Sequence, residues 1–159
     1  MVLGHAALGK VLTAFAASPG KPTFFNDAEL ETVRLLVDLI LPETDSPSAS
    51  AAGTHYFIDL ALPACANAAA QRTFRDGLAS FAGLGTQSPQ KRIATLAERA
   101  NADQALEYDV SFFKILKDYT LSGYFLSETG ATRALAYEKI PGGFQGDLPL
   151  APGQKAWAI

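Results

Sequence analysis

Two residues of types that bind metal ions or move protons stand at helical spacing in the sequence. His55 and Asp59 are four residues apart, so on a helix they would share one face. Cys65, the single cysteine of the chain, is a distant third ligand. A structural zinc site requires four ligands, and two ligands at helical spacing occur often by chance. The spacing therefore favours a solvated or helix-capping role for His55 over a metal site.

Glu43 and Asp45 form a pair of carboxylates in the stretch PETDSPSASAAG. Paired carboxylates carry out acid–base catalysis or bind Ca²⁺, but this pair lacks the ligand spacing of an EF-hand. Proline, serine, aspartate and threonine are turn formers, so a loop without a chemical role is the favoured interpretation. The alternative that stays open is a free-standing helical metal-dependent enzyme or ligand-binding protein that uses His55, Asp59 and Glu43.

The motifs that position a nucleophile or a phosphate are missing from the sequence. It contains no G-x-S-x-G turn, and Gly142-Gly143 is not part of a G-x-G-x-x-G loop after a strand. A single cysteine excludes both the C-x-x-C-H haem attachment motif and the cysteine-rich zinc patterns. We therefore predict no catalytic residue, no metal and no cofactor in this chain.

The segment from Tyr119 to Phe144 combines glycines and aromatic residues with a Ser-Glu pair. Aromatic side chains at a surface anchor protein–protein interfaces, and elsewhere they fill the core of their own chain. We interpret this segment as part of a docking surface for a larger partner. The candidate partner-binding residues are Tyr124, Phe125, Ser127, Glu128, Tyr137, Pro141 and Phe144.

The composition is consistent with a permanent partner, although an Ala-rich soluble domain has a similar one. Hydrophobic residues make up 48% of the 159 residues and charged residues 18%, against a typical charged share of about 25%. The net charge is −3 and the Lys and Arg residues are scattered, so a nucleic-acid partner is not expected. No apolar run reaches the roughly 20 residues that a membrane-spanning helix needs.

Helical signals dominate the chain from Asn26 onward. Asn26 and Glu29 have the spacing of a capping box at the start of a helix over 27–41, which Pro42 ends. Two helices are expected over 54–62 and 65–84, with a bend near Pro63. A short helix over 90–100 follows Ser88 and Pro89, with Ile93 and Leu96 facing inward.

The longest helix is predicted over 104–121, with Asp103 as its cap and Gly123 at its end. Ser127 and Glu128 would open one more short turn, and a Pro- and Gly-rich arm from Ile140 would run over the surface. The predicted class is all-α, with about five to six helices in one small domain over residues 24–159. Residues 1–23 would be a short amphipathic helix or the remnant of a trimmed leader.

Three blocks carry a family resemblance when they are taken in order. They are FFNDAELETVRLLVDLILPETDSPSASAAGTHYFIDL (24–60), RTFRDGLASF (72–81) and FFKILKDYTLSGYFLSETGATRALAYEKIPGGFQGDLP (112–149). Together they resemble the gluconate 2-dehydrogenase subunit 3 family, the small cofactor-free subunits of flavin-dependent sugar and sugar-acid dehydrogenases. Part of the third block, GYFLSETGATRALAYEKIPG, looks more like the branch that accompanies FAD-dependent glucoside 3-dehydrogenases.

The resemblance implies a non-catalytic subunit that stabilises its catalytic partner or helps it to mature. That partner would be of the glucose-methanol-choline oxidoreductase type and would carry the FAD and the active-site base, with a c-type cytochrome as a frequent electron acceptor. Family members commonly begin with a twin-arginine leader, and this sequence contains no Arg-Arg pair. A periplasmic location with the partner is therefore expected if a leader was removed, and a cytoplasmic one is the alternative.

Overall fold

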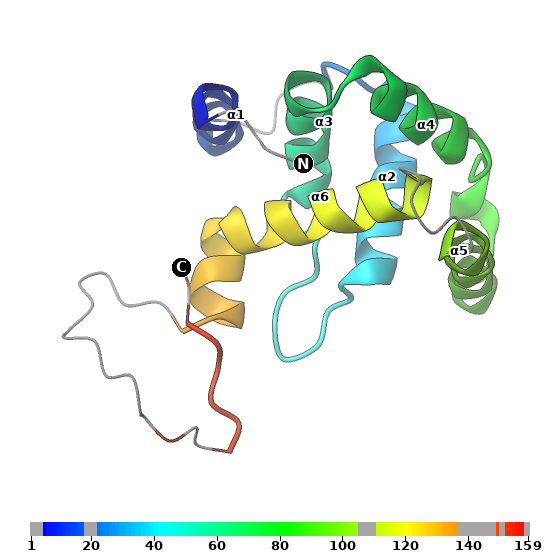
Figure 1. Cartoon of the computed structure of the whole chain (residues 1–159). Coiled ribbons are helices and arrows are strands. Elements are labelled where there is room, and N and C mark those ends of the chain that lie inside the picture. The colour runs from blue at the N-terminus through cyan, green and yellow to red at the C-terminus, as the bar shows by residue number, and fades with distance from the viewer. Residues whose placement is uncertain (1–4, 18–21, 105–110, 137–148, 150–151, 158–159) are drawn as a thin grey trace.

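The computed structural model describes residues 5–17, 22–104, 111–136, 149 and 152–157 (Figure 1). Within these residues all regular elements are helices and no strand forms, which confirms the predicted all-α class. The elements are α1 (His5–Ala17), α2 (Asp27–Ile40), α3 (Thr54–Cys65), α4 (Ala68–Ala79), the 3-10 turn η1 (Leu84–Thr86), α5 (Pro89–Gln104), α6 (Phe112–Leu126) and the π-helical turn η2 (Gly130–Ala134).

Helix α2 begins as the sequence predicts. The Asn26 side chain accepts a hydrogen bond from the Glu29 backbone N–H at 2.9 Å, and the Glu29 carboxylate accepts one from the Asn26 N–H at 2.9 Å. Each of these bonds satisfies an N–H that a helix start leaves without a partner inside the helix. The buried face of α2 consists of Leu30, Val33, Leu36 and Val37.

The two helices predicted around Pro63 do form, and the boundary between α3 and α4 lies at Ala66, three residues after Pro63. Pro63 sits in the last turn of α3, which continues to Cys65. The chain then becomes extended at Ala66, and the Asn67 side chain starts α4 by accepting a hydrogen bond from the Ala70 N–H at 2.9 Å. The N-cap at Asn67 therefore determines where the chain turns from α3 into α4.

The helix predicted over 104–121 does form, but it starts later and ends later than predicted. Asp103 belongs to the end of α5, and α6 starts only at Phe112, after an N-cap at Ser111. Asp103 still caps α6, because its carboxylate accepts a hydrogen bond from the Phe113 N–H at 2.7 Å. Residues 105–110, which the predicted helix included, lie outside the described residues.

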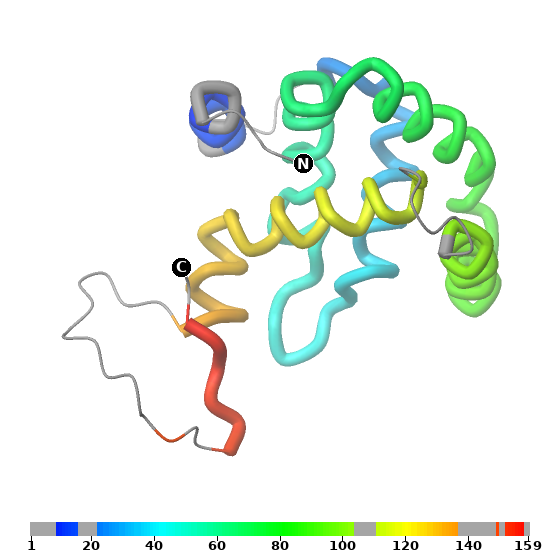
Figure 2. The backbone as a smooth tube through the Cα atoms, viewed as in Figure 1, coloured from blue at the N-terminus to red at the C-terminus, as the bar shows by residue number. Residues whose placement is uncertain are grey.

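Helix α6 runs across α2, α3 and α4, and two glycines allow its closest contacts (Figure 2). A Cβ on Gly77 of α4 would lie 2.3 Å from Cγ of Phe112, and a Cβ on Gly123 would lie 2.6 Å from Cδ1 of Phe57 in α3. Gly123 therefore lies inside α6, which continues to Leu126, and does not end the helix as predicted. The Phe112 ring packs between Phe74 and Phe81, with ring centroids 5.2 and 5.4 Å away.

The remaining elements are attached at the edges of this core. Helix α1 packs on α3, where Val11 is buried and Phe15 contacts the Phe57 ring edge-on, so a helix does form within residues 1–23. Leu96 of α5 faces inward as predicted, but Ile93 is 59% exposed. Near the C-terminus the Ala136 N–H donates to the Ala156 carbonyl at 2.7 Å, which places the described tail beside the end of η2 (Figure 1).

Candidate functional site

The carboxylate of Asp59 is buried and serves the fold. It accepts hydrogen bonds from the backbone N–H groups of Thr23, Phe24 and Phe25 at 2.7–2.9 Å, and from the Thr23 hydroxyl at 2.9 Å. Three consecutive N–H groups compensate the loss of water around a buried charge. Asp59 therefore ties the segment before α2 to the middle of α3, and its oxygens are already occupied.

His55 is buried one turn before Asp59, and no hydrogen bond joins the two side chains. Within the described residues its Nδ1 atom has no hydrogen-bond partner, and its ring packs on Tyr56 with centroids 4.2 Å apart. Burial lowers the pKa of His55 below its usual value of 6.5, and the positive charge of Arg34 lowers it further. The imidazole is thus held in its neutral form at neutral pH.

Glu43 and Cys65 lie apart from this pair. Glu43 is exposed in the loop after α2, and Cys65 is the last residue of α3, where burial raises the pKa of its thiol. No three His, Cys, Asp or Glu side chains among the described residues come close enough to hold a metal ion. The geometry therefore does not assemble His55, Asp59 and Glu43 into one site.

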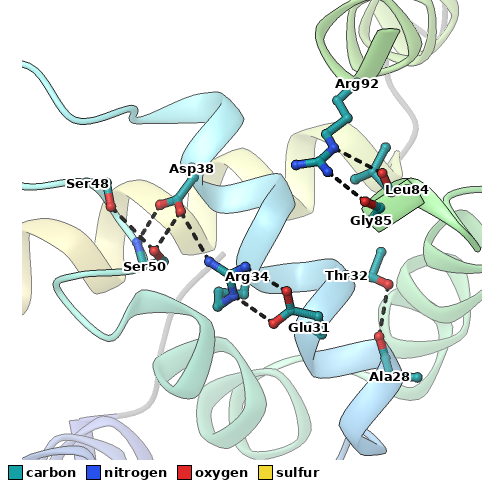
Figure 3. Close-up of polar contacts among 10 residues, drawn as sticks. All are labelled: Ala28, Glu31, Thr32, Arg34, Asp38, Ser48, Ser50, Leu84, Gly85 and Arg92. Carbon is teal, nitrogen blue, oxygen red and sulfur yellow. Dashed lines mark hydrogen bonds and ion pairs between the residues drawn. The ribbon is translucent and has the colours of Figure 1, made fainter. Parts of the chain in front are cut away.

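Polar contacts fix the loop over residues 41–53 against α2 (Figure 3). The Asp38 carboxylate accepts hydrogen bonds from the Ser50 N–H at 2.8 Å and from the Ser50 hydroxyl at 2.6 Å. Arg34 lies between Asp38 and Glu31, and its guanidinium forms two hydrogen bonds to Glu31 of 2.6 and 2.7 Å. These bonds lower the pKa of Glu31. The loop that carries Glu43 is thus a fixed part of the fold.

Four of the predicted partner-binding residues lie at or just after the end of α6, and two of them are buried while two are exposed. Tyr124 is only 3% exposed, and its hydroxyl donates a hydrogen bond to the Pro47 carbonyl at 2.8 Å. Ser127 is buried as well, because its hydroxyl donates to the Tyr124 carbonyl and accepts from the Gly130 N–H. Tyr124 and Ser127 therefore support this chain's own core and the turn into η2, and their side chains are not presented at the surface.

Phe125, Leu126 and Glu128 face outward at the same end. Phe125 is 39% exposed and Leu126 is 47% exposed, and the Glu128 side chain is exposed. Leu126 was absent from the residues predicted from the sequence. The signal in the sequence is its position directly after Phe125.

A comparison with known families decides what kind of chain this is. The family model described as gluconate 2-dehydrogenase subunit 3 matches residues 27–142. The chain belongs to the gluconate 2-dehydrogenase subunit 3 family. No curated protein and no solved structure gives a significant match. The family assignment makes the chain a small subunit of a dehydrogenase complex.

The match to the gluconate 2-dehydrogenase subunit 3 family starts with the first residue of α2, so α1 lies outside it. It covers α2 to η2 and extends beyond Pro141, whereas Phe144 lies past its end. Tyr137, Pro141 and Phe144, which the sequence also predicts to bind a partner, lie outside the described residues. None of the described helices combines the length and apolar content that crossing a membrane requires.

Proposed function

We propose that this chain is a non-catalytic small subunit that binds an FAD-bearing catalytic subunit and stabilises it or helps it to mature. The observation that carries the proposal is the family match over residues 27–142. The Asp59 geometry supports it further, because the carboxylate that a metal or acid–base site would need is fully used within the fold. The flavin, the active-site base and the substrate then belong to the partner.

The exposed end of α6 is the surface that we assign to this contact. Phe125 and Leu126 are adjacent apolar side chains open to solvent, and their burial by a partner would be favourable. Glu128 lies beside them and adds a charge at the rim. Tyr124 contributes indirectly, because its hydrogen bond to Pro47 holds the last turn of α6 in place.

The finer assignment follows the resemblance of the sequence blocks. The partner is of the glucose-methanol-choline oxidoreductase type and oxidises a sugar or a sugar acid, of which a glucoside 3-dehydrogenase is the favoured kind. A c-type cytochrome accepts the electrons from the flavin. The complex works in the periplasm, where such an electron chain is expected.

Co-expression with the catalytic subunit tests the proposal. The two chains should co-purify, and the catalytic subunit produced without this chain should contain less FAD and show less dehydrogenase activity with an artificial acceptor. Turnover of a sugar by this chain alone, or a metal ion bound at one per chain, would contradict it.

A substitution then locates the contact. Phe125→Ser should weaken co-purification about tenfold or more, because an apolar anchor is lost from the interface. Ile93→Ser is the matched control, since Ile93 is a large apolar side chain exposed on α5. Equal co-purification of the wild type and Phe125→Ser would remove the end of α6 from the interface.

A further inference from the structure

A cavity of about 400 Å³ opens between the end of α3, the start of α4 and the middle of α6. Its apolar wall comes from Ala66, Ala70, Ile115 and the ring of Tyr119, and Cys65 lies beside them. Burial raises the pKa of the Tyr119 hydroxyl to about 12, with a smaller contribution from Cys65, and burial raises the pKa of the Cys65 thiol. Of the described lining residues, Cys65 and Tyr119 are therefore both uncharged at neutral pH.

Among the described lining residues, the charged ones are Lys114 and Asp118, which we call the rim of the cavity. Lys114 and Asp118 are one helical turn apart on α6, and both side chains are exposed. Among the described residues neither of them takes part in an ion pair. Because both side chains are exposed at the cavity, they are available to pair with charges on a partner surface.

The rim is continuous with the exposed end of α6. Residues at positions i, i+4, i+7 and i+11 of a helix share one side, and here these are Lys114, Asp118, Leu121 and Phe125. At 1.5 Å of rise per residue this stripe is about 16 Å long. Lys114, Asp118 and Phe125 are exposed and Leu121 is partly buried. One side of α6 thus connects the cavity to the surface that we assign to the catalytic subunit.

We propose that the cavity receives an apolar side chain of the catalytic subunit, flanked in that subunit by an acidic residue that pairs with Lys114 and a basic residue that pairs with Asp118. The proposal rests on the proposed function and adds a second contact to it. The cavity has room for an aliphatic or aromatic side chain, and interfaces concentrate binding energy where such an anchor enters a preformed pocket. The opposite charges at the rim complement the flanking pair and fix the orientation of the inserted segment.

Filling the cavity tests the proposal. Ala70 is partly buried in the cavity wall, so Ala70→Phe should place a ring in part of the space and weaken binding of the catalytic subunit about tenfold or more. Ala82→Phe is the matched control, because Ala82 lines a different cavity, between α2 and the segment after α4. Equal binding by a folded Ala70→Phe and by the wild type would overturn the proposal.

The single thiol gives a second measurement that needs no substitution. Cys65 should react with a thiol reagent in the free chain and be protected at least about tenfold in the complex with the catalytic subunit. Equal reactivity in both states would overturn the proposal even if Ala70→Phe failed to fold. Protection by a sugar in the absence of the catalytic subunit would also overturn it, in favour of a small-molecule site.

These outcomes are distinguishable from failure of the proposed function. If the wild-type chains do not co-purify, the subunit role itself is wrong. If they co-purify and Cys65 stays reactive in the complex, only the cavity contact is wrong and the rest of the interface remains.

Discussion

Asp59 joins the entry of α2 to the middle of α3 through three backbone N–H groups and one hydroxyl. At the scale of a single residue, a buried charge with this many donors stabilises the fold only while all of the donors remain paired. Removing the charge leaves the N–H groups of Thr23, Phe24 and Phe25 buried against a weaker acceptor.

We expect Asp59→Asn to lower the free energy of unfolding by about 2–4 kcal/mol, because the amide group brings N–H donors toward N–H donors. Glu43→Gln is the control, since Glu43 is exposed, and its effect should stay within about 0.5 kcal/mol. Urea denaturation followed by far-UV circular dichroism measures both. Similar midpoints for the two variants would show that the Asp59 bonds are not formed in solution.

His55 makes stability depend on pH. Its pKa in the folded chain is lowered from 6.5, so between the two pKa values the unfolded chain binds more protons than the folded chain. The stability is therefore fully present above about pH 6.5 and falls as the pH drops toward the pKa of the folded state. The urea midpoint of the wild type should fall over this window more steeply than that of His55→Gln. Parallel curves for the two proteins would contradict the assignment.

At the scale of the elements, the packing of α6 on its neighbours depends on two glycines, whose lack of a Cβ atom leaves room for aromatic rings. Gly77 lets Phe112 lie against the backbone of α4, and Gly123 lets α3 approach α6 through Phe57. Helix propensity alone favours alanine over glycine at both positions, by about 1 kcal/mol. The contacts of α6 with α3 and α4 therefore decide that glycine is tolerated at these two positions and alanine is not.

Gly77→Ala should lower the free energy of unfolding by about 1–3 kcal/mol, because the new methyl group would lie 2.3 Å from the Phe112 ring. Gly85→Ala is the matched control, since its Cβ would meet only Leu35 at 3.8 Å, and its effect should stay below about 1 kcal/mol. Thermal unfolding by circular dichroism compares the two. A stabilised Gly77→Ala would mean that α4 and α6 are farther apart than described.

The elements also show which local signals determine structure. The start of α2 is predictable because Asn26 and Glu29 bond to each other's backbone within one turn. The boundary between α5 and α6 is not predictable in this way. Asp103 has the residue type of a cap for the residues that directly follow it, but its hydrogen bond is to the N–H of Phe113, ten positions later. Ile93 has the spacing of a core residue, and only the position of α5 at the edge of the fold leaves it exposed.

At the scale of the whole molecule, some features of the candidate site can be predicted from the sequence and others cannot. The sequence predicts a docking segment from Tyr119 to Phe144, of which Phe125 and Glu128 are exposed, and it resembles the family that the match over residues 27–142 confirms. It does not tell Tyr124 from Phe125, because the difference is the hydrogen bond from Tyr124 to Pro47 across 77 positions. The cavity beside Cys65 is likewise made by residues of three helices and leaves no local pattern.

Binding of the catalytic subunit should stabilise the small subunit by mass action. At a free concentration of the catalytic subunit 100 times the Kd, the expected gain is about 2.7 kcal/mol, seen as a higher unfolding midpoint that rises with concentration. The double variant Phe125→Ser, Ala70→Phe should lose this gain while its own unfolding remains cooperative. A midpoint independent of the catalytic subunit would place the contact elsewhere or rule it out.

Trp157 is the only tryptophan of the chain, and it lies in the described tail with 56% of its surface exposed. Its backbone pairs with Ala136 outside the helical core. Indole emission will therefore resemble that of a solvated chromophore before and after the helices melt, and it is a poor probe of their unfolding. A blue shift on mixing with the catalytic subunit would instead report that the tail has become shielded from water.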